Sequence, residues 1–216
     1  MKKKLIILTG PTAVGKTDLS IRLARTVGGE IISADSMQVY RRMDIGTAKI
    51  RPEEMDGVRH HLIDILEPTE SFNAFLFKEY ALKAANEIWE RGSIPIIVGG
   101  TGFYIQTLLY DIEFAKSDEN DGIRDELNKL YEEHGAAFLH DMLAKADPEY
   151  AAEVHENNVK KVIRAIEFYR QTGHKLSEHN TEQRERTSPY NFEYFVLSDD
   201  RAVLYERIDK RIDKMV

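Results

Sequence analysis

The chain has 216 residues, of which 42% are hydrophobic and 31% charged, and it contains no cysteine. This composition excludes a collagen-like or largely disordered chain, and the missing thiols exclude disulfides and cysteine-based zinc sites. A formal net charge of -7 argues against a protein that coats nucleic acid with its whole surface, but it is compatible with a local basic strip.

Residues 1–100 alternate short β-branched runs with helical periodicity, which is typical of a parallel sheet covered by helices. The apolar runs are continuous rather than alternating, as in strands that are buried on both faces. The expected elements, in chain order, are a strand at 5–9, a helix at 15–27, strands at 31–33 and 62–65, a helix at 73–91 and a strand at 94–98.

From about residue 112 the strand signals stop and helices follow one another. Apolar stripes of helical spacing indicate successive helices, with one closing at Gly135, one starting at Asp147-Pro148 and one ending at Gly173. Beyond them we expect a polar loop at 176–190, a strand at 192–197 and a final helix at 199–216.

The sequence thus predicts an α/β core formed by residues 1–111 and 191–216, with an all-helical insertion at 112–190. The last helix reaches Val216 without a glycine, proline or polar stop signal, so we expect the natural protein to continue beyond this residue. The N-terminal apolar run is far too short for a signal peptide, and no segment approaches the roughly 18 apolar residues of a membrane span. We therefore expect a cytoplasmic protein without a membrane contact.

Between the first strand and the first helix, the sequence matches the phosphate-binding pattern G-x-x-x-x-G-K-[ST]. The matching residues are Gly10, Pro11, Thr12, Ala13, Val14, Gly15, Lys16 and Thr17. In such a loop, backbone amides and the helix N-terminus surround phosphate oxygens, the lysine adds a charge and the threonine hydroxyl binds Mg²⁺. The motif predicts a P-loop NTPase-like core with a diphosphate or triphosphate ligand. It leaves the reaction open, because ATP hydrolysis, phosphoryl transfer and departure of pyrophosphate from carbon all need this cradle.

Ligands of open parallel sheets bind beyond the carboxyl ends of the strands, so the residues after each strand are candidates. The second strand is followed by Ala-Asp-Ser-Met-Gln-Val-Tyr at 34–40, and the fourth by the tight turn Gly-Gly-Thr-Gly at 99–102. Asp64, inside the third apolar run, could bind a metal or simply face outward. We expect His60 and His61 to frame the third strand, because adjacent side chains of an extended segment point to opposite sides.

Together these motifs resemble the tRNA dimethylallyltransferase family, also called tRNA isopentenyltransferases. The resemblance is carried by GPTAVGKT at 10–17, ISADSMQVY at 32–40, MDIGTAK at 43–49, HHLID at 60–64, VGGTG at 98–102 and NVKKVIRA at 158–165. It covers essentially the whole chain, although members of the family continue with a largely helical C-terminal portion that this sequence lacks. It implies transfer of a dimethylallyl group from its diphosphate to the exocyclic amine of the adenosine 3′ of the anticodon.

By this resemblance, Asp35 is the base that takes the proton of the amine, and Thr101 lies beside the target adenine or the reacting carbon. Lys16, Mg²⁺ on Thr17 and an arginine stabilise the leaving diphosphate. The family pattern favours Arg211 or its neighbour as this arginine, and it leaves open whether Arg207, which shares the same helix face, meets the diphosphate instead. Each residue also has a simpler reading. Asp35 could only cap its turn, Thr101 could serve only its turn, and the arginines could lie on a solvated helix face.

The resemblance also implies contacts with the anticodon stem-loop of tRNA, whose target base must leave its stack to react. Basic residues outnumber acidic ones within 160–186, which favours the insertion as the handle for the RNA, although a solvated helix face is the alternative. The residues expected to contact tRNA are Asp35, Ser36, Met37, Gln38, Thr101, Arg124, Lys160, Lys161, Val162, Ile163 and Arg164.

The motifs leave other functions open. The cradle alone is compatible with a small-molecule kinase that uses the insertion as a lid, or with a nucleotide-gated RNA-binding module without chemistry. A related prenyltransferase acting on free adenine nucleotides would need no RNA handle. The preferred hypothesis is a monomeric tRNA-modifying enzyme with dimethylallyl diphosphate as donor and Mg²⁺ as cofactor.

Overall fold

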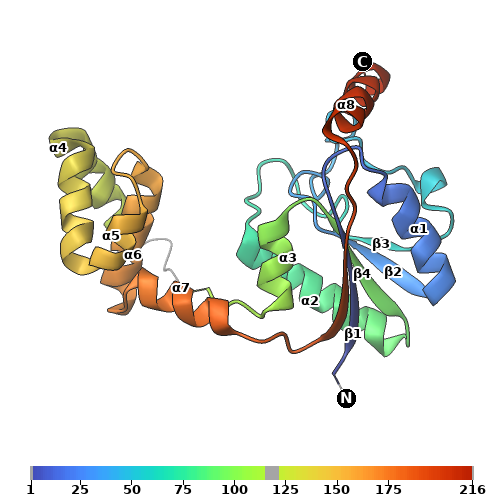
Figure 1. Ribbon diagram of the computed structural model, residues 1–216, viewed down its shortest axis with the longest axis horizontal. Coiled ribbons are helices and arrows are strands. Elements are labelled where there is room, and N and C mark those ends of the chain that lie inside the picture. The colour runs from blue at the N-terminus through green and yellow to red at the C-terminus, as the bar shows by residue number, and fades with distance from the viewer. Residues whose placement is uncertain (1, 115–121, 216) are drawn as a thin grey trace. The chain divides into compact units, whose positions relative to one another are not determined.

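The computed structural model describes residues 2–114 and 122–215 (Figure 1). It divides into two compact units, one formed by Met1–Ile112 with Thr187–Val216 and the other by Glu113–Arg186. We refer to the first as the α/β unit and to the second as the helical unit.

The α/β unit is built on one parallel sheet. Its strands are β1 (Lys4–Thr9), β2 (Gly29–Ser33), β3 (His60–His61), β4 (Ile94–Gly99) and β5 (Asn191–Val196). Their order is β3-β2-β4-β1-β5, and every neighbouring pair runs parallel. The expected parallel sheet is thereby confirmed, and the carboxyl ends of all its strands lie at one edge.

The third strand differs from the expectation. His60 and His61 pair with β2, whereas residues 62–65 do not form a strand. Leu62 and Asp64 have φ angles of 63° and 55°, which belong to the left-handed region and interrupt an extended chain. The prediction of a strand at 62–65 is therefore wrong, since this apolar run forms a turn that buries Leu62.

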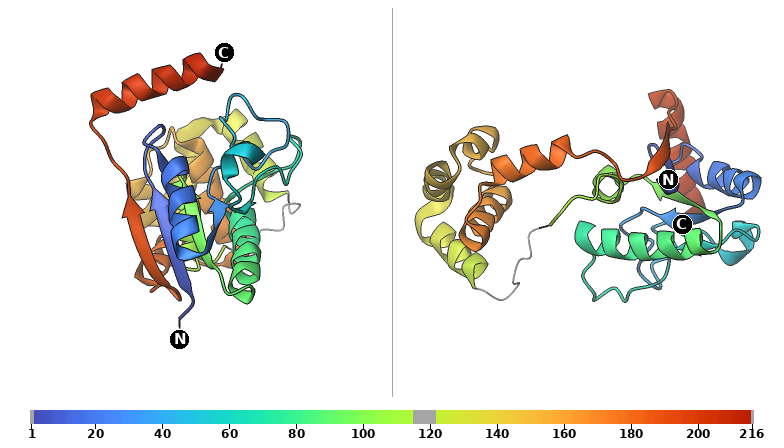
Figure 2. Two further views of the ribbon diagram at one scale, coloured as in Figure 1. Left: turned by 90° about the vertical axis from the view of Figure 1, so that its right-hand side faces the viewer. Right: turned by 90° about the horizontal axis from the view of Figure 1, so that it is seen from below.

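The helices of the α/β unit are α1 (Lys16–Val27), α2 (Ala74–Glu90), α3 (Gly102–Leu109) and α8 (Arg201–Met215), with a 3₁₀ turn, η1, at Pro52–Met55. Ile31 and Ile96 of the sheet pack against Ile21 and Ala24 of α1. Because strand side chains alternate between faces, their buried neighbours Ile32 and Ile97 point to the other face, and α1 and α2 cover opposite faces (Figure 2). The sequence did not lead us to expect α3.

Trp89, on α2, contacts residues at the start of β1 and in the segment just before β5. Its indole N–H donates to the carbonyl of Lys4 at 2.7 Å, and its ring stacks on Tyr190 with centroids 5.7 Å apart. The Lys3 ammonium lies 4.5 Å from the centroid of the same ring. Trp89 therefore fixes the start of β1 and the segment that leads into β5.

The described part of the helical unit consists of α4 (Ile123–Ala146), α5 (Pro148–Glu153), α6 (Val159–Thr172) and α7 (Leu176–Glu185). Gly135, with φ 82° and ψ 179°, interrupts α4 where the sequence predicts a helix end. The unit has its own core, which includes Leu127, Leu139, Leu143, Val162, Ile163 and Ile166. None of the helices among residues 2–114 and 122–215 is long and apolar enough to cross a membrane.

The helix α7 replaces much of the loop expected at 176–190, so that prediction is wrong. Leu176 is buried in the core of the helical unit. The backbone amide and the hydroxyl of Ser177 donate to the carboxylate of Asp147 at 2.8 and 2.7 Å. These tertiary contacts anchor the first turn of a helix whose remaining residues are polar.

Candidate functional site

The strand ends converge at the carboxyl edge of the sheet because two glycines permit it. A Cβ atom on Gly99 would lie 2.2 Å from the carbonyl oxygen of Ala34, and one on Gly10 would lie 2.5 Å from that of Leu197. Gly10 also has a φ of 151°. The segments that follow β1, β2, β4 and β5 can therefore approach one another closely only with glycine at these two positions.

The P-loop occupies the turn between β1 and α1. Gly15, with φ 93°, is the residue before α1 and has no side chain with which to cap the first amides of the helix. These amides and the positive end of the helix dipole form the kind of site that binds phosphate. Lys16 Nζ donates to the carbonyl oxygens of Gly10 and Pro11 at 2.8 and 2.7 Å, so the lysine folds over the loop.

Lys16 lies in the electrostatic field of two residues that are distant in sequence. Burial lowers the pKa of the Lys16 ammonium, the positive charge of Arg211 lowers it further, and the negative charge of Asp35 opposes the shift. The charges that act on Lys16 thus come from the segment after β2 and from α8. All three residues were expected in the site from the sequence.

Asp35 is half-buried directly after β2 and closes a turn. Its Oδ1 atom accepts hydrogen bonds from the backbone amides of Met37 and Gln38, at 2.8 and 3.2 Å. The capping role that the sequence left open is thus present, in addition to the proximity to Lys16. Both bonds use the same carboxylate oxygen.

The two candidate arginines of α8 have different environments. Arg211 is half-buried, and its guanidinium donates to the carbonyl oxygen of Thr47 at 3.3 Å. Arg207 forms an ion pair with Asp199 at 3.0 Å. The structure therefore brings Arg211, but not Arg207, toward Lys16.

Thr101 is half-buried at the residue before α3. Burial raises the pKa of the Tyr104 hydroxyl, and the neighbouring Tyr40 adds to this shift. Met37 and Phe103 are 42% and 52% exposed, so each turn that carries a candidate residue also presents a large apolar side chain to solvent.

Lys49 is a residue of this region to which sequence analysis assigned no role. Its side chain is only 4% exposed and forms ion pairs with Asp44 and Asp64. Asp64, which the sequence offered as a metal-binding acid, therefore has a lysine partner. A lysine in a polar segment is ordinarily solvated, so its burial had no signal in the sequence.

In the helical unit, Lys160, Lys161 and Arg164 are exposed on α6. Val162 and Ile163 are 1% and 6% exposed, so their side chains hold the helix in the core of the unit, and the expectation that these residues contact tRNA stays a prediction.

Arg124, a further expected tRNA contact, has a partner within the helical unit. Its guanidinium forms an ion pair with Glu167, whose side chain is largely buried. Part of its capacity to donate hydrogen bonds is therefore used inside the unit.

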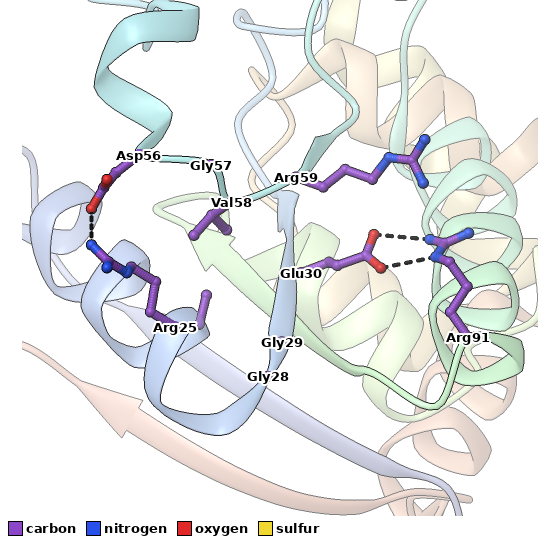
Figure 3. Close-up of a pocket in the computed structure, with 10 residues that line it drawn as sticks. Arg25, Gly28, Gly29, Glu30, Asp56, Gly57, Val58, Arg59 and Arg91 are labelled. Atoms are coloured by element: carbon purple, nitrogen blue, oxygen red, sulfur yellow. Dashed lines mark hydrogen bonds and ion pairs between the residues drawn. The ribbon is translucent and has the colours of Figure 1, made fainter.

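A separate hollow of about 550 Å³ lies at the amino end of β2 (Figure 3). Four of its charged groups form two pairs: Arg91 donates to both carboxylate oxygens of Glu30 at 2.9 Å, and Arg25 pairs with Asp56. The C-terminal end of α1 lies here, and its partial negative charge disfavours anions. This hollow is at the opposite edge of the sheet from the P-loop and is not the candidate site.

A parallel sheet whose first strand leads through a glycine-rich loop into a helix defines a P-loop α/β protein. A family model described as IPP transferase matches residues 38–216. A tRNA dimethylallyltransferase of Lachnoclostridium phytofermentans is 58% identical over 98% of this chain and 68% of that protein. The chain belongs to the IPP transferase family.

Two solved structures are similar in sequence and in fold. One is a tRNA delta(2)-isopentenylpyrophosphate transferase of Staphylococcus epidermidis, with 47% identity, a TM-score of 0.64 and coverage of 99% of this chain and 69% of that chain. The other is a eukaryotic dimethylallyltransferase acting on tRNA, with 36% identity, a TM-score of 0.89 and coverage of 99% and 52%.

Proposed function

We propose that the protein transfers a dimethylallyl group from dimethylallyl diphosphate to the exocyclic amine of the adenosine 3′ of the anticodon, with release of diphosphate. The observation that carries this proposal is the geometry at the carboxyl edge of the sheet. Lys16 folds over the P-loop, while Arg211 and the side chain of Gln38, whose backbone amide donates to Asp35, both donate to the Thr47 carbonyl. In this proposal, Lys16 and Arg211 are the cationic groups for the departing diphosphate, and Asp35 is the carboxylate that accepts a proton. Membership of a family whose relatives bear the name of this reaction supports it further.

The leaving group gains negative charge as its bond to carbon breaks. Lys16, Arg211 and the amides at the start of α1 supply preorganised donors for this charge, in a position where the loop excludes part of the water. The hydrogen bonds of Lys16 to two loop carbonyls keep its ammonium at the mouth of the cradle.

The exposed hydroxyl of Thr17, at the second position of α1, offers the hard oxygen ligand that Mg²⁺ prefers. We propose that Thr17 holds Mg²⁺ together with diphosphate oxygens and water. Bound there, the ion would neutralise part of the charge on the leaving group.

The amine of adenine is a weak nucleophile that must lose a proton as the new bond to carbon forms. We assign Asp35 as the acceptor of this proton, with Thr101 beside the reacting groups. Ser36, Met37 and Gln38 surround the everted base in this proposal, and the exposed basic residues of α6 bind the phosphates of the anticodon stem-loop. One chain supplies all these groups, so we propose a monomer, acting in the cytoplasm.

The test is to incubate the protein with dimethylallyl diphosphate, Mg²⁺ and either unmodified tRNA or AMP, and to quantify prenylated adenosine by mass spectrometry. We expect product on tRNA and none on AMP. Product on AMP would indicate the prenyltransferase of free nucleotides. Release of ADP from ATP without any consumption of the prenyl donor would indicate a kinase, and binding of tRNA without product at any salt concentration would indicate an RNA-binding module.

A further inference from the structure

Lys49 is a buried lysine whose ammonium group is fully hydrogen-bonded. Its Nζ atom lies 2.7 Å from the carbonyl oxygen of Tyr40, 2.7 Å from Asp44 Oδ1 and 2.6 Å from Asp64 Oδ1. An ammonium group has three donors, so these contacts use all of them. Burial lowers the pKa of Lys49, but the hydrogen bonds to the two carboxylates outweigh this effect and raise it, so the group stays charged.

These bonds join two separate parts of the chain. Tyr40 and Asp44 belong to the segment after β2, and Asp64 belongs to the turn after β3, where its φ of 55° lies in the left-handed region. Backbone bonds continue the same connection, since the amide of Asp64 donates to Gln38 and that of Ile65 donates to Val39. Lys49 therefore ties the segment that carries Gln38 to a turn beside the sheet.

The tie also closes residues 44–49 on themselves. The backbone amide of Lys49 donates to the carbonyl of Asp44 at 3.1 Å, while the side chain of Lys49 bonds to the side chain of Asp44. Thr47 lies inside this closed segment, and its hydroxyl donates to the carbonyl of Met43 at 2.6 Å. The direction of the Thr47 carbonyl is thereby fixed.

The carbonyl oxygen of Thr47 accepts hydrogen bonds from two groups of the candidate site. The side-chain amide of Gln38 and the guanidinium of Arg211 both donate to it at 3.3 Å. Arg211 is the arginine whose charge acts on Lys16. A chain of contacts therefore leads from Lys49 through Thr47 to Arg211, the arginine to which the proposed function assigns the leaving diphosphate.

We propose that Lys49 is a positioning residue for diphosphate binding and departure, because it holds the Thr47 carbonyl that orients Arg211 toward the cradle. The inference deepens the proposed function and rests on it. Lys49 itself touches neither substrate. Loss of its charge would allow residues 44–49 to open and Arg211 to swing away.

The substitution Lys49→Met tests this inference, because it keeps the length of the side chain and removes the donors. The side chains of Asp44 and Asp64 are 65% and 50% exposed, so water can solvate both carboxylates after the change. The matched control is Arg91→Met, which removes one of the partners of the largely buried Glu30 at the opposite edge of the sheet (Figure 3). Circular dichroism and thermal melting would verify that both variants fold.

The direct measurement is the affinity for inorganic pyrophosphate with Mg²⁺, by titration calorimetry. We expect about a tenfold loss for Lys49→Met, as is typical when a group that orients a ligand residue is removed, and no change for Arg91→Met. The affinity for pyrophosphate should be the same in Arg211→Met as in the double variant Lys49→Met/Arg211→Met, since Lys49 acts through Arg211. An unchanged affinity in Lys49→Met, or fully additive losses in the double variant, would overturn the inference.

Asp64→Asn is a second variant in case Lys49→Met does not fold, because it removes one carboxylate and leaves the lysine in place. We expect a smaller loss of pyrophosphate affinity than in Lys49→Met, and no further loss when Arg211 is already replaced. An affinity unchanged by Asp64→Asn in the protein with Arg211 would contradict the inference. This binding experiment does not require turnover. Absence of prenylation by the unsubstituted protein would therefore refute the proposed function separately from the role of Lys49.

Discussion

Asp35 combines a structural and a proposed chemical role in one carboxylate. Because the turn uses only Oδ1, we expect Asp35→Asn to keep the turn and the fold but to lose the proton acceptor. The rate of the chemical step should fall by about 10²–10⁴, with tRNA affinity and melting temperature unchanged. Single-turnover prenylation and filter binding would measure this. Asp35→Ala should show the same loss of rate and, in addition, a lower melting temperature; a full rate in either variant would exclude Asp35 as the base.

The arginines of α8 offer a matched pair of substitutions. We expect Arg211→Met to lower the rate of transfer about 10²-fold, because it removes a cationic donor from the leaving diphosphate. Arg207→Met should leave the rate within about twofold of the unsubstituted value, since its guanidinium pairs with Asp199. Steady-state kinetics with dimethylallyl diphosphate would show the difference. Equal losses in both variants would contradict the assignment.

At the level of residues, sequence patterns identified Lys16 and Asp35 because the P-loop and the turn after β2 are local in the chain. Patterns could not separate Arg207 from Arg211, since residues four apart share a helix face and only tertiary contacts distinguish them. Val162 belongs to the apolar stripe of its helix, so periodicity already carried the signal for its burial.

Among the elements, the continuous apolar strands and the α1 and α2 periodicities were predictable because each produces its own pattern. The turn at 62–65 was not, because its apolar residues resemble a strand until the left-handed φ angles are known. The start of α7 depends on Leu176 and on the distant carboxylate of Asp147, which no local pattern indicates. The glycines at 99–102 predicted a turn but gave no sign that α3 begins directly within it.

Asp147 gives the helical unit a dependence on pH. Burial disfavours its charge, but hydrogen bonds from the Ser177 hydroxyl and from the amides of Ser177, Tyr150 and Leu176 outweigh burial and hold the pKa of the carboxyl below its ordinary value. A depressed pKa in the folded state contributes stability that is present above the unfolded pKa of about 3.9 and is lost as pH falls through the folded pKa.

We therefore expect Asp147→Asn to destabilise the helical unit by about 1–3 kcal/mol at pH 7, and by progressively less as the pH falls below about 4. Urea titrations followed by circular dichroism at 222 nm would measure both differences. Asp141→Asn is the control, because Asp141 is exposed on α4, and its effect should be negligible. A difference for Asp147→Asn that stays constant down to low pH would contradict the assignment.

For the whole molecule, the proposed division of labour places RNA binding in the helical unit and chemistry in the α/β unit. We expect Lys160→Glu combined with Arg164→Glu to weaken tRNA binding and to reduce the dependence of log affinity on log salt concentration by about 1–2. The affinity for pyrophosphate should not change. Fluorescence anisotropy of labelled tRNA at several salt concentrations would test both statements.

The control for this experiment is Lys129→Glu, an exposed lysine on α4 among acidic neighbours. It changes the net charge of the same unit without altering the basic face of α6. The loss of tRNA affinity per reversed charge can be compared between Lys129→Glu and the double variant of α6. If the two losses were equal, the effect would reflect net charge and the proposed interface would be wrong.

Trp89 is the only tryptophan in the chain, and it lies where α2, β1 and the segment before β5 meet. Its emission spectrum consequently reports on the α/β unit alone, whereas backbone ellipticity sums over both units. If the two units melt independently, the two optical signals will give transitions at different denaturant concentrations. The protein thus carries an intrinsic probe with which the cooperativity between its units can be measured without any label.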